Sequence, residues 1–251
     1  MAKQKGIFPL SGSIGGVNFY FLKGEPVARA AGGGFNGKQI RNSPKMVRVR
    51  ENMSEFGWCS TLKKELRLAL LPFYTAHNDP TLHGRMMRLL QAVKTHDTVS
   101  ARGQRRVGMG MQTEAGRQLF ADFAFSPKRR FAELLGTAGM FDADSLAYAV
   151  SGFSVASVQF PAAATHAEVL YGVLRFDFES LDHSLAMAPA LLFTAAAAPG
   201  EFVLVPETLP EGNGTRIAFG CVRFYQEVNG NKVALGDVNG FGLGVLGIVD
   251  L

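Results

Sequence analysis

The segment YGVLRF at residues 171–176 recurs as FGCVRF at residues 219–224. Both copies lie in longer runs that are rich in apolar residues and have a period of two, which is typical of β-strands. A glycine and an arginine stand in the same phase of each copy, and a glutamate follows at the same offset. The two runs are therefore predicted to be equivalent central strands of two facing sheets.

Short candidate strands surround this repeat. Asn229-Gly230, between two of them, is a strong hairpin signal because both residues readily adopt the positive φ angles of a two-residue turn. About seven strands at short spacing, with no helical period between them, predict an antiparallel β-sandwich over residues 146–251. The candidate strands are Phe153–Phe160, His166–Phe178, Leu185–Thr194, Glu201–Val205, Thr215–Val228, Lys232–Leu235 and Phe241–Val249.

Residues 35–145 are interpreted as a small basic helical unit. Ser43-Pro44 has the order preferred at the start of a helix, and this helix is expected to end before Pro72. Further helices are expected after Thr81, near Thr113–Phe120 and after Ser126-Pro127.

The first of these helices has one apolar stripe, formed by Leu62, Leu66 and Leu70. The charged residues of the same helix are expected on its wetter faces. They include Arg48, Lys63 and Arg67.

Residues 1–34 are predicted to form a β-hairpin arm, which gives the chain an α+β fold of arm, helical unit and sandwich. A lone hairpin is marginally stable in water, so this arm needs a sheet to join, in its own chain or in another copy. A glycine-rich joint, Ala30–Gly34, follows it. The residues expected to make the subunit contact are Ile7, Ile14, Val17, Phe19, Tyr20 and Phe21.

Charge is divided between the two halves of the chain. Residues 1–135 contain 22 Lys and Arg against 9 Asp and Glu, whereas residues 136–251 contain 4 against 12. Such a division indicates either a polyanionic partner for the first half or copies of the chain that meet head to tail.

The basic residues of the first half gather in three clusters. Arginine-rich loops and helix starts can bind phosphates, and such binding weakens as the salt concentration rises. The alternative is that these residues pair with acids, either locally with Glu51 and Glu55 or on a neighbouring subunit. The candidate basic contact face consists of Arg41, Arg48, Arg50, Arg102, Arg105, Arg106, Lys128, Arg129 and Arg130.

No residue pattern points to a reaction. The cysteines, Cys59 and Cys221, are isolated and expected to be buried, the histidines lack metal-ligand spacing, and the glycines of residues 242–247 are not followed by the helix that a dinucleotide motif requires. We therefore expect neither an enzyme nor a cofactor. Arg175 and Arg223 are interpreted as ion-paired or strand-edge residues, with ligand reading as the alternative.

The opening residues lack the apolar run of a secretory signal, and no segment has the length and apolar character of a membrane span. We expect synthesis in the cytoplasm. Later release as an extracellular filament is an alternative that the sequence leaves open.

The chain resembles an uncharacterised family of bacterial proteins with a G-x-I-G-x-x-x-F-Y arm and an R-E-N-x-x-E-F-G helix. The resemblance implies a fold and no established activity. Members of the family have a charged or turn-like segment after the first Phe-Tyr pair, whereas this chain has Phe21-Leu22 at that place. The matching residues are Gly6, Ile7, Gly12, Ile14, Gly15, Phe19, Tyr20, Ala28, Arg29, Gly32, Gly33, Arg48, Arg50, Glu51, Asn52, Glu55, Phe56 and Gly57, with further similarity at residues 100–103 and 224–230.

The leading hypothesis is a structural subunit that assembles with copies of itself into a filament or fibre. The arm would add strands to the sandwich of the next subunit, and the basic helical unit would lie against an acidic neighbour. A nucleic-acid-associated protein that uses the basic half is the alternative. A third hypothesis is a monomeric sandwich that recognises a carbohydrate or a protein.

Overall fold

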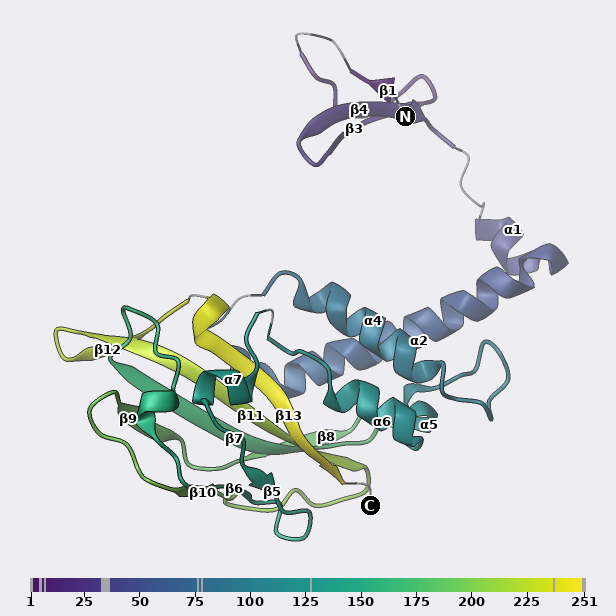
Figure 1. The fold of residues 1–251 in the computed structure, drawn as a ribbon. Coiled ribbons are helices and arrows are strands. Elements are labelled where there is room, and N and C mark those ends of the chain that lie inside the picture. Colours follow the sequence, from purple (N-terminus) through teal and green to yellow (C-terminus); the bar gives the residue numbers. More distant parts are fainter. Residues whose placement is uncertain are drawn as a thin grey trace. The chain divides into compact units, whose positions relative to one another are not determined.

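The computed structural model describes residues 2–4, 6, 8–32, 37–75, 77, 79–126, 128–236 and 238–249. The chain divides into two compact units, Met1–Arg50 and Glu51–Leu251, and each is described by itself. Helices and antiparallel sheets are both present, so the predicted α+β class is confirmed (Figure 1).

The first unit contains a four-stranded antiparallel sheet with the order β1-β4-β3-β2. Its two tight turns, Gly15-Gly16 and Lys23-Gly24, have positive φ at both central residues, which matches the twist of a hairpin. The long strands β3 and β4 are each paired on both edges. The elements of this unit are β1 (Ala2–Lys3), β2 (Gly12–Ile14), β3 (Val17–Leu22), β4 (Glu25–Ala30), α1 (Gly37–Asn42), a 3-10 helix (Pro44–Met46) and the start of α2 (Val47–Ala69).

Helices form one layer of the second unit. The predicted start at Ser43-Pro44 and the end before Pro72 agree with the 3-10 helix and with α2. The helix expected near Thr113–Phe120 is α6, and the Thr113 hydroxyl caps it by accepting a hydrogen bond from the Gly116 amide at 3.1 Å. The remaining helices are α3 (Leu71–Tyr74), α4 (Leu82–Lys94), α5 (Val107–Met111), α6 (Glu114–Ala121) and α7 (Phe131–Leu135).

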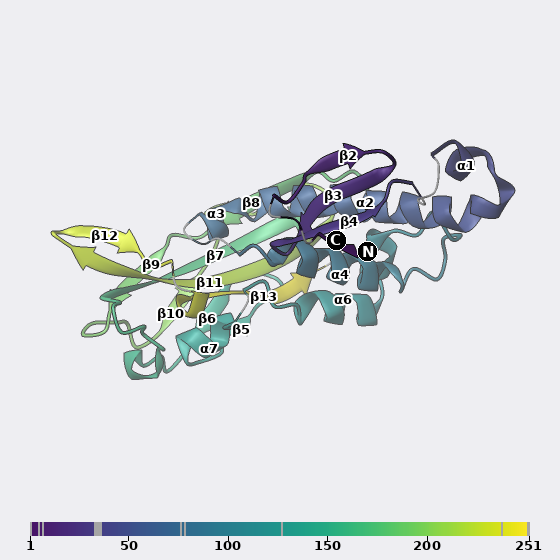
Figure 2. The same cartoon turned by 90° about the horizontal axis from the view of Figure 1, so that it is seen from above.

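A six-stranded antiparallel sheet is the centre of the second unit, and its two longest strands, β7 and β11, lie side by side (Figure 2). The predicted strand Leu185–Thr194 is two strands, β8 and β9, separated at Pro189, and both pair with β7. The members of the sheet are β7 (His166–Phe176), β8 (His183–Met187), β9 (Leu191–Thr194), β11 (Thr215–Val228), β12 (Asn231–Ala234) and β13 (Phe241–Val249).

The sequence repeat therefore does not mark two facing sheets, and that prediction was wrong. Its two copies are antiparallel neighbours in one sheet, with Gly172 opposite Phe219 and Gly220 opposite Tyr171. Each glycine leaves room for side chains of neighbouring elements, Met187 and Leu185 at Gly172 and Leu246 and Phe131 at Gly220.

A smaller antiparallel sheet has the order β10-β6-β5. The predicted strand Phe153–Phe160 is wrong, because this segment contains a 3-10 helix (Val155–Ser157). Phe153 and Val158, on either side of this helix, are buried. The strands are β5 (Met140–Phe141), β6 (Tyr148–Val150) and β10 (Phe202–Leu204), and another 3-10 helix (Val238–Gly240) precedes β13.

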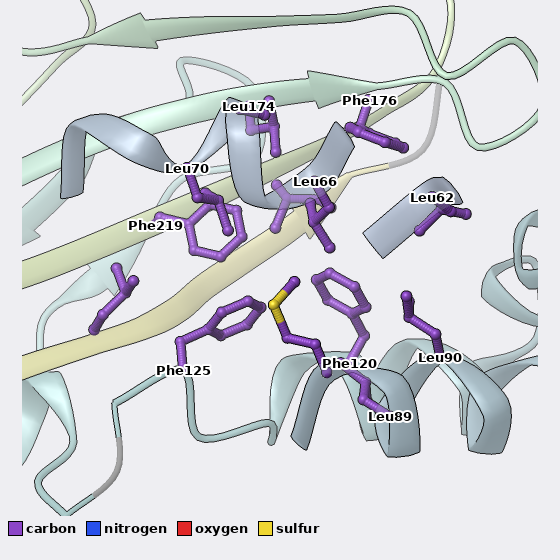
Figure 3. Packing of buried hydrophobic residues seen from close by; sticks show 14 of the residues in the cluster. Leu62, Leu66, Leu70, Leu89, Leu90, Phe120, Phe125, Leu174, Phe176 and Phe219 are labelled. Atoms are coloured by element: carbon purple, nitrogen blue, oxygen red, sulfur yellow. The ribbon is translucent and has the colours of Figure 1, made fainter. Parts of the chain in front are cut away.

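Both faces of the large sheet are covered by apolar cores. The first core joins α2, α4 and α6 to one face of β7 and β11, as Figure 3 shows for Leu66, Phe120, Phe125 and Phe219. The second core joins α7 and the small sheet to the other face, where the rings of Tyr148 and Tyr171 stack. Two sheets thus face each other, as predicted, but helices cover the outer side of the larger one.

Candidate functional site

The sheet of the first unit has one face without polar side chains among its described strand residues. The register places Phe19 opposite Ala28, Phe21 opposite Pro26 and Val17 opposite Ala30, so these side chains share a face. We call this surface the apolar face, and it consists of Ala2, Gly12, Ile14, Val17, Phe19, Phe21, Pro26, Ala28 and Ala30. The sheet thus brings together Ile14, Val17, Phe19 and Phe21 of the predicted arm.

Polar groups gather on the opposite face. Lys3 pairs with Glu25 at 3.2 Å, and the Arg29 guanidinium lies 5.6 Å from the centre of the Tyr20 ring. Tyr20 therefore lies apart from the other predicted arm residues, and Ile7 is outside the described residues.

Little of this sheet is buried. Val27, on the polar side, is the one buried residue among the described residues of the first unit. On the apolar face Ile14 is 59% exposed and Phe21 is 52% exposed. A contiguous apolar surface of this kind is typical of an interaction site.

A second apolar surface lies on the outer side of the small sheet. Met140, Ala149 and Val203 form one cross-strand row there, while their neighbours along the strands point into the core. Met140 is 80% exposed and Val203 is 62% exposed. The sequence analysis missed this surface because a strand as short as β5 gives no periodic signal.

Carboxylates border this row. Asp142 follows β5 and Glu201 precedes β10, and the alternation of the strands places both on the outer side. Backbone amides of Asp144 and Ser145 donate to the Asp142 carboxylate and lower its pKa, which keeps it ionised. We call Met140, Ala149 and Val203, with Asp142 and Glu201, the rimmed patch.

Two of the predicted basic contact residues are held by local acids. Arg102 lies 3.3 Å from Glu51, and Arg105 lies 3.0 Å from Glu55. Glu55 also accepts from the Lys94 ammonium at 2.6 Å and from the Gly103 amide at 2.7 Å. The local pairing with Glu51 and Glu55 that the sequence analysis left open is therefore present.

The Glu55 carboxylate is the centre of this network. Burial by itself would raise its pKa, but the hydrogen bonds from Lys94, Gly103 and Arg105 lower the pKa from 4.5 to about 2. The network ties α2 to the loop that precedes α5, so it is a structural contact.

The other basic residues of the predicted face have different surroundings. Arg106 packs over the Trp58 ring at 4.6 Å, and Arg50 donates to the carbonyl oxygens of Ile40 and Ser43 at 2.7 and 2.9 Å. Arg41 and Arg48 are exposed in the first unit.

The remaining cluster of the predicted basic face, Lys128, Arg129 and Arg130, is exposed before α7. The segments before α5 and before α7 lie at different ends of the second unit (Figures 1 and 2). These two clusters therefore lie apart from each other in the fold.

The arginines of the repeat are ion-paired, as the sequence analysis expected. Arg175 lies 2.9 Å from Asp182, and Arg223 pairs with Glu168. Cys59 and Cys221 are free thiols that are fully buried, and burial raises the pKa of both.

The described part of the chain contains no group of three or more His, Cys, Asp or Glu side chains that could hold a metal ion. Within the same ranges, none of the helices is both long and apolar enough to cross a membrane. Comparisons with protein-family models, with curated proteins and with solved structures gave no match.

Proposed function

We propose that this protein is a structural subunit that assembles with copies of itself into a filament or fibre. The observation that carries the proposal is the apolar face, a surface on which Ile14 and Phe21 are exposed and Val17 and Phe19 are half-buried. Small sheets need a packed hydrophobic face for stability, and burial of these side chains supplies the driving force for association.

The apolar face of one copy is proposed to pack against the rimmed patch of a second copy. The first unit contains nine Lys and Arg residues and one acidic residue, Glu25, whereas Asp142 and Glu201 border the rimmed patch. Two apolar sheet faces would pack together, and the net positive charge of the first unit would favour the carboxylates that border the rimmed patch. Because the contact joins two different surfaces, it repeats and produces an open polymer unless its rotation closes.

Face packing replaces the strand addition that the sequence analysis expected. The outer edges of the long strands are partly covered, because β2 pairs with Val17–Phe19 of β3 and β1 pairs with Val27 and Ala28 of β4. The covering strands are two and three residues long, so the sheet leaves only short stretches of free edge for another sheet.

Phe21→Asp tests the apolar face, and Leu22→Asp is its matched control. The two residues are adjacent in β3, are both exposed and point to opposite faces. Sedimentation velocity and negative-stain microscopy should show that Phe21→Asp raises the critical concentration for assembly about ten- to a hundredfold, while Leu22→Asp does not. A wild-type protein that stays monomeric at high concentration, or two variants with equal assembly, would contradict the proposal.

Val203→Asp tests the other half of the contact. Each of Phe21→Asp and Val203→Asp removes one surface and leaves the other intact, so neither protein should polymerise. A mixture of the two should form one-to-one dimers that do not grow, measured by sedimentation velocity. Val233→Asp, at an exposed position of β12, is the control and should polymerise. Mixed proteins that remain monomers would refute the pairing of these two surfaces.

A nucleic-acid-associated function is the second proposal, and the excess of basic residues in the first unit favours it. Binding to a DNA duplex should then weaken steeply as salt is raised, and Arg41→Gln should reduce both the affinity and the salt dependence. Absence of binding at low ionic strength would exclude this function.

We further propose that the chain belongs to the bacterial family that its arm and helix resemble. Glu51, Asn52 and Glu55 of the helix motif contact Arg102, Gly103 and Arg105 of the loop before α5. Two separated parts of the resemblance thus form one structural contact, which supports a shared fold.

A further inference from the structure

A cavity of about 640 Å³ lies between α2 and the start of α4. Its residues from α2 follow the spacing of one helix face, and His83 contributes from α4. The lining residues are Ser60, Thr61, Lys63, Lys64, Arg67, Leu68, Leu71 and His83. Three cationic side chains and an imidazole thus line it, and no Asp or Glu is among the lining residues.

Lys63 is the unusual member of this set. The sequence analysis placed it on a wetter face, but it is 5% exposed, so that prediction was wrong. Its Nζ lies 3.0 Å from Nδ1 and 3.3 Å from Nε2 of His83, and no described carboxylate forms an ion pair with it. Burial lowers the pKa of the Lys63 ammonium, and the nearby Arg67 lowers it further.

A buried ammonium without a carboxylate is costly unless another anion neutralises it. The two neighbouring cations lie at the mouth of the same cavity: Arg67 is exposed, and Lys64 makes an exposed pair with Glu65 at 3.4 Å. Such a set excludes a metal ion and favours a multiply charged oxyanion, which Arg and Lys bind by charge-assisted hydrogen bonds.

The cavity is larger than one oxyanion requires. Its volume lies in the range of small-molecule sites, and Leu68 and Leu71 add an apolar edge. Leu68 is 49% exposed and Leu71 is 55% exposed, so both are free to contact an organic group.

We propose that this cavity binds a small phosphorylated molecule, with the phosphate held by Lys63, Arg67 and His83 and the organic part against Leu68 and Leu71. The site is distinct from the surfaces assigned to assembly, so it stands or fails independently of them.

Isothermal titration calorimetry of the full chain tests the site with pyrophosphate and ADP as probes. Arg67→Gln should weaken binding of both about ten- to a hundredfold, because it removes a charge-assisted contact. Arg88→Gln on α4 is the matched control, since Arg88 is exposed, lies outside the cavity and makes only a 3.4 Å bond to Gly84. No binding by the wild-type protein, or equal losses in both variants, would overturn the proposal.

Lys63→Met gives a second test because it keeps the buried stem and removes the charge. The variant should fold, since it loses an ammonium without a carboxylate partner, and should no longer be stabilised by pyrophosphate in thermal unfolding. Persistence of the wild-type thermal shift in Lys63→Met would refute the site.

Two further probes separate other sources of phosphate. Vesicles that contain phosphatidic acid and a DNA duplex are compared with pyrophosphate, each against wild-type protein and Arg67→Gln. We expect Arg67→Gln to weaken the binding of pyrophosphate and ADP. If Arg67→Gln weakened binding only to the vesicles or only to DNA, the cavity would bind the phosphates of a macromolecular surface. That result would overturn the small-molecule proposal.

Discussion

The N-terminal sheet and the six-stranded sheet are built from similar strands but differ in what covers them. In β3 the apolar alternation ends in exposed side chains, and Phe21 is 52% exposed. In β7 and β11 both faces are buried, and Phe219, Tyr171 and Val222 have no exposed surface. Helices cover one face of the larger sheet, and α7 with the small sheet covers the other.

The comparison shows that an apolar strand pattern specifies a face to be buried and does not specify what buries it. The second unit supplies its own cover, and it also pairs most of its buried charges, as Glu55 and Lys94 show. Among its described residues the first unit has a single buried side chain, and its sequence has an excess of basic residues. Under the assembly proposal, a second copy supplies the burial and the opposite charge that this unit lacks.

The largest expected effect separates the two sheets by stability. Phe219→Ala removes a ring whose centre lies 5.2 Å from the centre of the Phe125 ring and 6.2 Å from that of Phe73. The substitution should lower the free energy of unfolding by about 3–5 kcal/mol. Phe21→Ala should change it by less than about 0.5 kcal/mol in dilute protein. Urea denaturation followed by fluorescence of Trp58, the single tryptophan, reports on the second unit, and far-ultraviolet circular dichroism of the same samples reports on both units. Equal losses would remove the distinction between a covered and an uncovered sheet.

The charge network of the second unit predicts an acid-sensitive fold. The pKa of Glu55 is lower in the folded chain, about 2, than its ordinary value of 4.5. Its contribution to stability is therefore present above about pH 4.5 and is lost as the pH falls toward 2, and the shift corresponds to roughly 3 kcal/mol.

Urea denaturation at several pH values between about 6 and 3 checks this contribution. Glu55→Gln leaves Lys94 buried without its carboxylate, so it should be destabilised near neutral pH and show a flatter pH dependence. Glu207→Gln, at an exposed position, should retain the wild-type slope. A wild-type slope in Glu55→Gln would show that other carboxylates carry the acid sensitivity.

Local signals in the sequence predicted many elements correctly. Ser43-Pro44 marks the helix start, and Asn229-Gly230 forms the expected turn with φ angles of 51° and 78°. These features depend on a few adjacent residues, whose backbone preferences act in any context. Four residues of the predicted arm contact, Ile14, Val17, Phe19 and Phe21, lie on the apolar face, whereas Tyr20 lies on the other face.

Features that depend on contacts between distant residues could not be predicted. The repeat shows that β7 and β11 are alike, but it does not show that they pair with each other in one sheet. Lys63 and His83 lie on different helices, and a helix pattern alone places a lysine in water. The rimmed patch depends on the two-residue strand β5, which is formed by its pairing with β6.

The smallest expected effect concerns the space beside Gly220 on a covered face of the large sheet. A methyl group at Gly220 would lie 2.6 Å from Cδ1 of Leu246 and 2.9 Å from Cε2 of Phe131, so Gly220→Ala should cost about 1–3 kcal/mol. Gly57→Ala is the control, because this exposed helical position is open, and alanine should stabilise the helix by up to about 1 kcal/mol. Urea denaturation compares the two. If Gly220→Ala were neutral, the Phe131 ring would have to move aside freely, and the close packing of α7 on β11 would not explain the glycine of the repeat.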